Sequence, residues 1–145
     1  MTAKDMTQTE GPLGAPPQAR HNQPRRILVV DDNDNIRNVN AQVLAHSGYH
    51  VDAAADGAAA WDSLQRASYD LLITDNNMPN VSGVELLHKL HAAHIVLPVI
   101  LATAIPPKAE FTKCPWLQPA AMLIKPYSFR ELLGTVKNVL CSTVP

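Results

Sequence analysis

Four short apolar runs of this sequence each end at a side chain that could do chemistry. These side chains are Asp31 with Asp32, Asp75, Thr103 and Lys125, and they follow the runs 26–30, 70–74, 98–102 and 121–124, respectively. Three carboxylates held close together repel one another and raise each other's pKa values unless a cation lies among them. Oxygen ligands favour a hard cation, and Mg²⁺ takes a few carboxylates while it keeps several waters. If folding gathers the ends of these runs, the sequence predicts a magnesium site there.

The remaining groups of this set suit the transfer of a phosphoryl group. An aspartate can act as a covalent nucleophile and form an acyl phosphate. The ammonium of Lys125 is a flexible point charge that suits a tetrahedral anion, and Thr103 offers a hydroxyl donor. A metal ion and a lysine together would neutralise the charge that spreads over the transferring oxygens. Each residue alone has an ordinary structural use, such as a helix N-cap for an aspartate, so only their shared placement at strand ends indicates function.

The apolar runs alternate with segments of helical periodicity. The run 26–30 is continuous rather than alternating, which is typical of a strand buried on both faces of a parallel sheet. A weaker strand is expected over 49–54, and the intervening helical patterns lie around Ile36–Leu44, Ala58–Arg66, Val84–Leu90 and Leu132–Leu140, the last opened by the capping box Ser128-x-x-Glu131. Five alternations predict an α/β fold, a doubly wound parallel sheet covered by helices. In such sheets the active crevice lies beyond the carboxyl ends of the strands.

Composition and length restrict the class of protein. The 145 residues suit one domain, with 46% hydrophobic and 17% charged residues and a formal net charge of −1. This charge does not favour nucleic-acid binding, and no apolar run reaches the roughly 18 residues of a membrane span. Residues 1–24 are proline-rich and polar without hydrophobic period, which predicts a flexible tail ahead of a domain over 25–142. No apolar leader precedes that domain, so we expect a cytoplasmic protein.

The strand-end residues stand in stretches that resemble the receiver domain of two-component response regulators. The stretches are Ile27-Leu28-Val29-Val30-Asp31-Asp32-Asn33, Asp70-Leu71-Leu72-Ile73-Thr74-Asp75-Asn76-Asn77-Met78-Pro79, Leu101-Ala102-Thr103-Ala104 and Lys125-Pro126-Tyr127. The spacings between them fit that family, and the resemblance covers about residues 25–142. It implies a flavodoxin-like sheet of order 2-1-3-4-5 with about five helices.

The resemblance also implies a role for each site residue. Asp75 would accept a phosphoryl group from a phosphohistidine on a sensor histidine kinase or a histidine phosphotransfer protein. Asp32, Asp75 and the backbone carbonyl of Asn77 would ligate Mg²⁺, with Asp31 acting through a metal-bound water. Lys125 would pair with the phosphoryl group, and Thr103 would swing to hydrogen-bond it. The bond between Lys125 and Pro126 would be cis.

The sequence departs from the family pattern at two places. Met122 stands three residues before Lys125, where the family commonly has an aromatic residue that moves with the threonine; packing within the strand is an equal reading of this methionine. The segment 105–119 carries four prolines, which predict a short or irregular fourth helix. Phe111 and Trp116 in that segment are expected to pack in the core, with exposure to a partner as the alternative.

The function that these features predict is an aspartyl-phosphate switch rather than a turnover enzyme. After Lys125 only one helix and a short tail remain, so we expect a single-domain regulator with no direct nucleic-acid or membrane partner and an unknown downstream protein. One alternative is a pseudo-receiver that binds proteins without phosphorylation. Another is a phosphohydrolase of similar topology, which Asn76 and Asn77 disfavour because it needs an acid–base carboxylate just after the nucleophile. His88 and His91, three apart, are expected on a solvated face.

Overall fold

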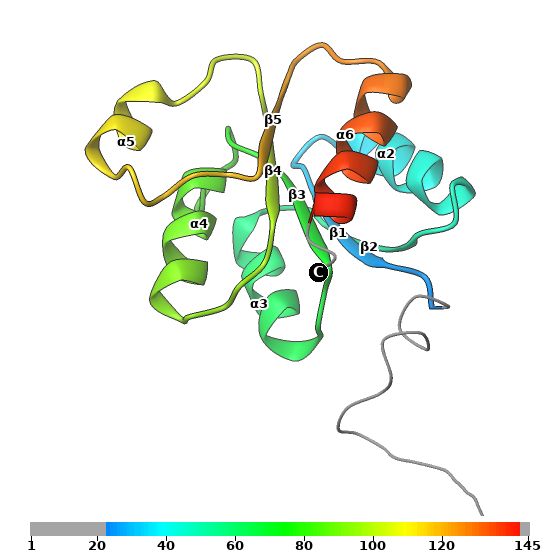
Figure 1. Ribbon diagram of the computed structural model, residues 1–145, viewed down its shortest axis with the longest axis horizontal. Helices are drawn as coiled ribbons and strands as arrows, with labels where there is room; N and C mark the ends of the chain where they lie inside the picture. Colours follow the sequence, from blue (N-terminus) through cyan, green and yellow to red (C-terminus); the bar gives the residue numbers. More distant parts are fainter. Residues whose placement is uncertain (1–22, 143–145) are drawn as a thin grey trace, which may run out of the picture.

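The chain forms a parallel five-stranded sheet with helices on both faces. The computed structural model describes residues 23–142. The strands lie in the order β2-β1-β3-β4-β5, all parallel, which confirms the predicted doubly wound fold (Figure 1). The elements are β1 (Arg26–Val30), α2 (Asp34–His46), β2 (His50–Ala54), α3 (Gly57–Arg66), β3 (Leu71–Asp75), α4 (Gly83–Ala92), β4 (Val99–Thr103), α5 (Lys108–Lys113), β5 (Ala121–Ile124) and α6 (Phe129–Ser142).

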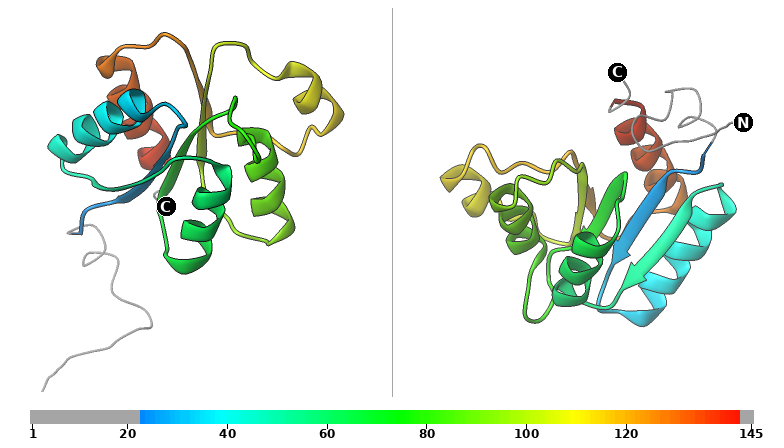
Figure 2. Two further views of the ribbon diagram at one scale, coloured as in Figure 1. Left: turned by 180° about the vertical axis from the view of Figure 1, so that it is seen from behind. Right: turned by 90° about the horizontal axis from the view of Figure 1, so that it is seen from below.

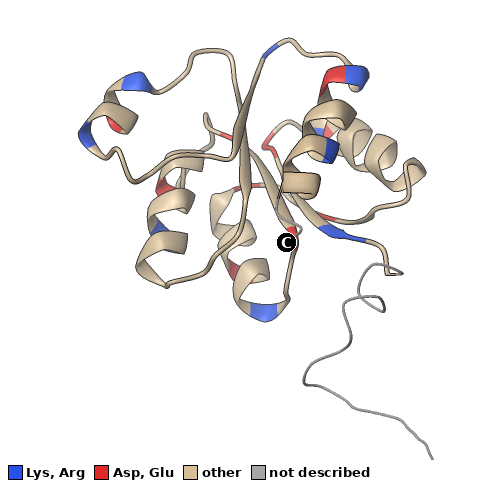
Figure 3. Cartoon of the chain, in the orientation of Figure 1, with Lys and Arg blue, Asp and Glu red and all other residues tan. Residues whose placement is uncertain are grey.

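The core consists of two apolar clusters separated by the sheet. Leu28, Leu72 and Leu101 point to the layer formed by α3, α4 and α5. Ile27 and Ile73 point to the opposite layer, formed by α2 and α6 (Figure 2). β3 and β4 are buried along their whole length, because their neighbours cover both faces and both edges. Charged residues lie mainly on helices and at strand ends, which leaves the middle of the sheet apolar (Figure 3).

Polar side chains start the helices directly after the strands. Asn33 accepts a hydrogen bond from the amide of Ile36 and caps α2 (3.1 Å). Asp56 caps α3 in the same way, and a capping box joins Ser82 to Glu85 at α4. The predicted box at α6 is also formed: the Glu131 amide donates to Ser128 Oγ, and the Ser128 amide donates to Glu131 Oε1. These caps satisfy amides that a helix start leaves unpaired, and so fix where each loop ends.

The fourth helical segment is short, as its prolines predict. α5 spans six residues, has Pro107 at its N-cap without a side-chain cap, and ends at Lys113, with Cys114 as its C-cap just before Pro115. Phe111 is buried as expected. Trp116 is 55% exposed, so the expectation that it packs in the core is wrong. Its ring lies against α4 instead, 4.2 Å from the His91 ring and 5.8 Å from the His88 ring between centroids, which gives these histidines an aromatic contact.

Two predictions concern the ends of the chain and its relation to membranes. The predicted tail, 1–24, lies almost wholly outside the described residues. Within residues 23–142, no helix has the length and apolar character that crossing a membrane requires.

Candidate functional site

The three predicted acids meet at the carboxyl edge of the sheet. Each of Asp31, Asp32 and Asp75 offers a carboxylate oxygen, and these oxygens lie within 4.8 Å of one another. Asp31 and Asp75 are buried, with 3% and 5% exposed, whereas Asp32 is exposed. β1 and β3 are neighbours in the sheet, so the residues that follow or end them lie side by side. The cluster is therefore open to solvent at Asp32 and buried at Asp31 and Asp75.

Lys125 reaches this cluster from the end of β5. Its Nζ lies 3.3 Å from Asp75 Oδ2 and 3.5 Å from Asp31 Oδ2. Burial lowers the pKa of Lys125, but the attraction of Asp31 and Asp75 is greater in sum, and the net pKa is raised. The lysine therefore stays charged and compensates part of the negative charge of the acids.

Asp31 is the acid whose ionisation the fold opposes most clearly. Burial raises its pKa, and the neighbouring carboxylates Asp75 and Asp32 add to this. The backbone amide of Asn33, which donates to Asp31 Oδ1 at 2.9 Å, and the charge of Lys125 act in the opposite direction, and the net pKa is raised. A second cation near Asp31 would remove this disadvantage.

The loop after β3 approaches Asp75 closely. The Asn77 amide donates to Asp75 Oδ1 at 3.3 Å, and the Thr74 hydroxyl donates to the Asp75 carbonyl at 2.9 Å. Asn76 Oδ1 accepts from the amide of Val84 and so ties this loop to α4. A Cβ on Gly83 would lie 2.8 Å from the Asp75 carbonyl oxygen, a separation that only glycine allows.

Thr103 is fully buried at the end of β4, between the strands that carry Asp75 and Lys125. Its hydroxyl donates to the Ile105 carbonyl (2.9 Å) and accepts from the Ile105 amide (3.3 Å). Ile105 itself is 78% exposed. In this conformation the Thr103 hydroxyl therefore hydrogen-bonds the backbone of the loop that leads to α5.

Two contacts near the site were not predicted from the sequence. Arg37 donates from Nη1 to the Asp31 carbonyl at 2.9 Å and pairs through Nη2 with Asp34, so it fixes the turn that carries Asp31. Asn40, only 5% exposed, donates from Nδ2 to the hydroxyl of Tyr127 at 2.8 Å. Val39, the apolar neighbour of Asn40 on α2, is 40% exposed, so the polar residue of this pair is the buried one.

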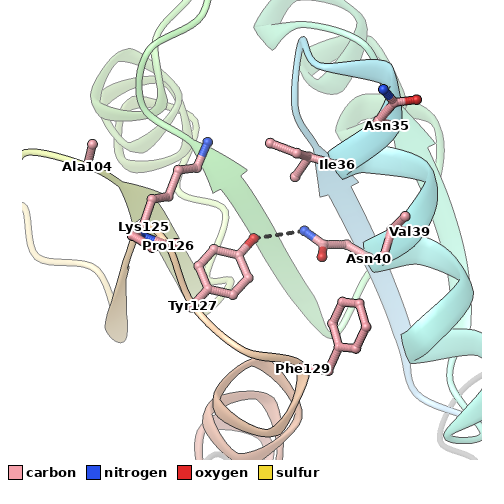
Figure 4. A pocket seen from close by; sticks show the side chains of 9 residues that line it. All are labelled: Asn35, Ile36, Val39, Asn40, Ala104, Lys125, Pro126, Tyr127 and Phe129. Atoms are coloured by element: carbon pink, nitrogen blue, oxygen red, sulfur yellow. Dashed lines mark hydrogen bonds between the residues drawn. The ribbon is translucent and has the colours of Figure 1, made fainter.

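A groove of about 610 Å³ lies beside the cluster, between α2 and the loop after β5. Figure 4 shows residues of α2 facing Lys125, Pro126 and Tyr127 across it. Its apolar lining includes Ile36, Val39 and Phe129, of which the last is 52% exposed. Lys125 lines the groove and also contacts the acids, so the groove adjoins the candidate site directly.

Met122 does not occupy a core position on β5. Its side chain is 39% exposed, and that of Ile124 is 48% exposed. Leu123, between them, is buried against the α6 layer. Met122 therefore lies in the strand as expected, but more than a third of the residue is exposed rather than packed.

The donor set fits a hard divalent cation. Among the described residues, the cluster consists of three carboxylates, with no cysteine or histidine as a member. One of the three, Asp32, is exposed to solvent. Mg²⁺ binds through a few carboxylates and retains waters, which an open edge can accommodate. Burial, with the neighbouring carboxylates, keeps the pKa of Asp31 raised despite Lys125, and a bound divalent cation would favour its ionised form.

Comparisons with known proteins agree with this geometry. The family model for the response regulator receiver domain matches residues 27–137. The response regulator receiver protein CpdR of Brucella abortus is 29% identical over 116 residues, 80% of this chain and 97% of CpdR. The probable transcriptional regulatory protein SilR of Salmonella typhimurium is 32% identical over 115 residues, 79% of this chain and 50% of SilR. The chain spans about half the length of several such regulators.

Solved structures share the fold. A CheY-like receiver domain protein from Methanospirillum hungatei JF-1 superimposes with a TM-score of 0.77 at 28% identity, covering 83% of this chain and 96% of that one. The chain belongs to the family of response regulator receiver domains, as its motifs suggested. Members of this family are signalling switches rather than enzymes that turn over an external substrate.

Proposed function

We propose that this chain is a cytoplasmic phosphorylation switch in which Asp75 is the phosphoacceptor. The observation that carries the proposal is the contact of one ammonium, Lys125 Nζ, with two buried carboxylates, Asp75 and Asp31. This arrangement places a positive charge beside a carboxylate nucleophile. It would compensate the negative charge that a phosphoryl group brings to the cluster.

The chemical step is a transfer from a phosphohistidine of a partner. A carboxylate oxygen of Asp75 attacks the phosphorus, an oxygen–phosphorus bond forms, and the phosphorus–nitrogen bond breaks. The imidazole nitrogen leaves with the electron pair of that bond and takes up a proton from solvent. Lys125 pairs with an equatorial phosphoryl oxygen throughout.

Asp32 and Asp75, together with the backbone carbonyl of Asn77, would hold Mg²⁺, and Asp31 would act through one of its waters. When bound, Mg²⁺ neutralises charge on the oxygens of the phosphoryl group. The role of the chain is to gather these oxygen ligands: the Asp31 turn is fixed by Arg37, and the Asp75 loop by Asn76.

The response to phosphorylation would pass through Thr103. Its hydroxyl must break its hydrogen bonds with the backbone of Ile105 in order to hydrogen-bond a phosphoryl oxygen. The loop to α5 would then be released from its present conformation, and α5 would change its affinity for a downstream protein. The exposed Met122 supports a readout through this loop rather than through an aromatic ring on β5.

The phosphodonor would be a sensor histidine kinase or a histidine phosphotransfer protein. Any donor that reaches Asp75 must cover the surface around it, and the groove lined by Ile36, Val39 and Phe129 adjoins Lys125. Apolar side chains of the donor would fill this groove. Affinity would therefore depend on Val39 and Phe129, which are exposed in the free chain.

Intact-protein mass spectrometry tests the proposal. The chain is incubated with Mg²⁺ and acetyl phosphate, next to Asp75→Asn and, as a matched control, Asp62→Asn, which changes an exposed aspartate of α3. We expect one phosphoryl group on the wild type and on the Asp62 variant, and none on the Asp75 variant or after chelation of Mg²⁺. A chain that accepts none from acetyl phosphate or from a panel of phosphorylated histidine kinases would instead be a protein-binding module.

A further inference from the structure

A polar pair lies next to the candidate site and has no part in the mechanism proposed above. The side chain of Asn40 is 5% exposed and is one of two buried residues of α2, the other being Leu44. An amide on the inner face of a helix costs free energy unless it finds a hydrogen-bond partner. Asn40 finds one far along the chain, in the hydroxyl of Tyr127, at 2.8 Å (Figure 4).

The hydrogen bond joins the two segments that carry opposite charges of the site. α2 begins at Asp34, two residues after Asp32, and Arg37 in its first turn donates to the Asp31 carbonyl. Tyr127 follows Lys125 by two residues in the loop between β5 and α6. In the sheet, β1 and β5 are separated by β3 and β4, so neither backbone pairing nor sequence connects these segments.

Few of the described contacts hold the Lys125 side chain in place. Its amide donates to the Thr103 carbonyl at 3.0 Å, which fixes the backbone at the end of β5. The four-carbon side chain beyond this point is flexible, and its ammonium is held only by the two carboxylates among the described contacts. Displacement of the loop that contains Tyr127 would shift the backbone on the C-terminal side of Lys125, from which this side chain has to reach Asp75.

We propose that Asn40 and Tyr127 are positioning residues that hold the Lys125 loop against α2 and thereby fix Lys125 Nζ beside Asp75. The inference rests on the proposed phosphoacceptor function and adds two residues to it. The pair acts through Lys125 and does not touch the phosphoryl group. Because the bond is partly buried and spans the groove beside the site, its removal changes geometry without removing a charged group.

Three variants separate positioning from a general contribution to stability. Tyr127→Phe removes one oxygen, Asn40→Leu replaces the amide by an apolar group of similar shape, and the double variant removes both polar partners. A buried polar group without its partner is costly, whereas replacement of both partners by apolar groups can be nearly neutral. We expect each single variant to unfold at lower urea concentration and the double variant to recover most of the loss.

Phosphorylation by acetyl phosphate then gives the decisive comparison. If the pair positions Lys125, the double variant, though stable, is phosphorylated about tenfold more slowly, since misplacement of a group by about 1 Å can cost up to 10²-fold. If the double variant recovers both its stability and the wild-type rate, the pair serves only the fold and the proposal is overturned. If the double variant does not fold, the phosphorylation rate of Tyr127→Phe, the mildest change, is compared with the wild-type rate instead.

A second readout does not depend on phosphorylation. Trace acetylation with acetic anhydride, followed by peptide mass spectrometry, compares the accessibility of Lys125 with that of exposed Lys137 on α6. We expect the ratio of Lys125 to Lys137 labelling to rise several-fold in the double variant, and an unchanged ratio contradicts positioning. If the wild type accepts no phosphoryl group, the proposed function fails, while the labelling ratio still decides the role of Asn40 and Tyr127.

Discussion

Lys125 Nζ lies 3.3 Å from Asp75 Oδ2, although Asp75 ends β3, Lys125 follows β5, and β4 lies between these two strands. The ion pair therefore connects across a whole strand at the carboxyl edge of the sheet. It is partly buried, with 23% of the lysine side chain and 6% of the aspartate side chain exposed. A substitution at Lys125 therefore leaves two carboxylates without this cation, whereas a substitution at Asp75 leaves Lys125 paired with Asp31.

Replacement of Lys125 by methionine keeps most of the length of the side chain and removes its charge. Two buried carboxylates then lose their cation, so we expect the free energy of unfolding to fall by about 1–2 kcal/mol, less than for a fully buried pair because the ammonium is partly exposed. Urea denaturation without metal measures this, with Lys137→Met on the exposed face of α6 as the control. Equal stability of the two variants would contradict the pairing seen here.

Asp31→Asn is expected to stabilise the chain at neutral pH without metal. The raised pKa of Asp31 means that the native state holds its proton more tightly than the unfolded state does. Stability from this group is therefore fully present below the unfolded pKa and is lost as pH rises through the folded pKa. The asparagine variant should lack this decline, and its Oδ1 can still accept from the Asn33 amide. Urea denaturation between pH 4 and pH 7 compares the slopes; parallel curves for the two proteins would argue against this ionisation effect.

Thr103→Val should separate phosphorylation from its consequence. The valine keeps the shape of the side chain but loses both hydrogen bonds to Ile105, which costs about 0.5–1.5 kcal/mol per bond. We expect Asp75 to be phosphorylated still, while the amides of Ala104 and Ile105, the two that precede Pro106, exchange faster before phosphorylation and change little after it. Hydrogen exchange followed by mass spectrometry measures this, and Thr103→Ser, which keeps the hydroxyl, should behave as the wild type. A full response in the valine variant would show that the hydroxyl does not hold the loop.

Two glycines give a matched pair of substitutions with opposite signs. A Cβ at Gly83 would lie 2.5 Å from Leu101 Cδ1 and 2.8 Å from the Asp75 carbonyl oxygen, so Gly83→Ala should destabilise by about 1–3 kcal/mol through overpacking. A Cβ at Gly134 on α6 meets nothing within 4 Å, so Gly134→Ala should stabilise by up to about 1 kcal/mol through helix propensity. Thermal unfolding of both variants checks these signs. Similar effects at the two positions would mean that the loop after Asp75 is not closely packed.

The sequence predicts the sheet and its active edge because both depend on local patterns. Continuous apolar runs give β3 and β4, and capping residues such as Ser128 give the helix starts. The meeting of Asp31, Asp75 and Lys125 then follows from the parallel topology. The motifs around these residues, together with the family resemblance, supply the strand order.

Contacts between distant side chains could not be predicted in this way. Asn40 sits on the inner face of α2, where a period-based reading expects an apolar residue, and its partner Tyr127 is far along the chain. The size of Trp116 predicts a core position, but the residue follows the short α5 and its ring packs on His91 of α4, partly exposed to solvent. Burial of such residues depends on the path of the backbone, which a one-dimensional pattern does not contain.

Identification of the phosphorylated residue tests the central claim most directly. The chain is treated with Mg²⁺ and acetyl phosphate, and the product is reduced with borohydride, which converts an aspartyl phosphate into homoserine while unmodified carboxylates persist. Peptide mass spectrometry then locates homoserine. We predict homoserine at residue 75 only, with none in a sample treated with chelator. Homoserine at Asp31 or Asp32 instead, or at no residue although intact mass shows a phosphoryl group, would contradict the assignment of Asp75 as the phosphoacceptor.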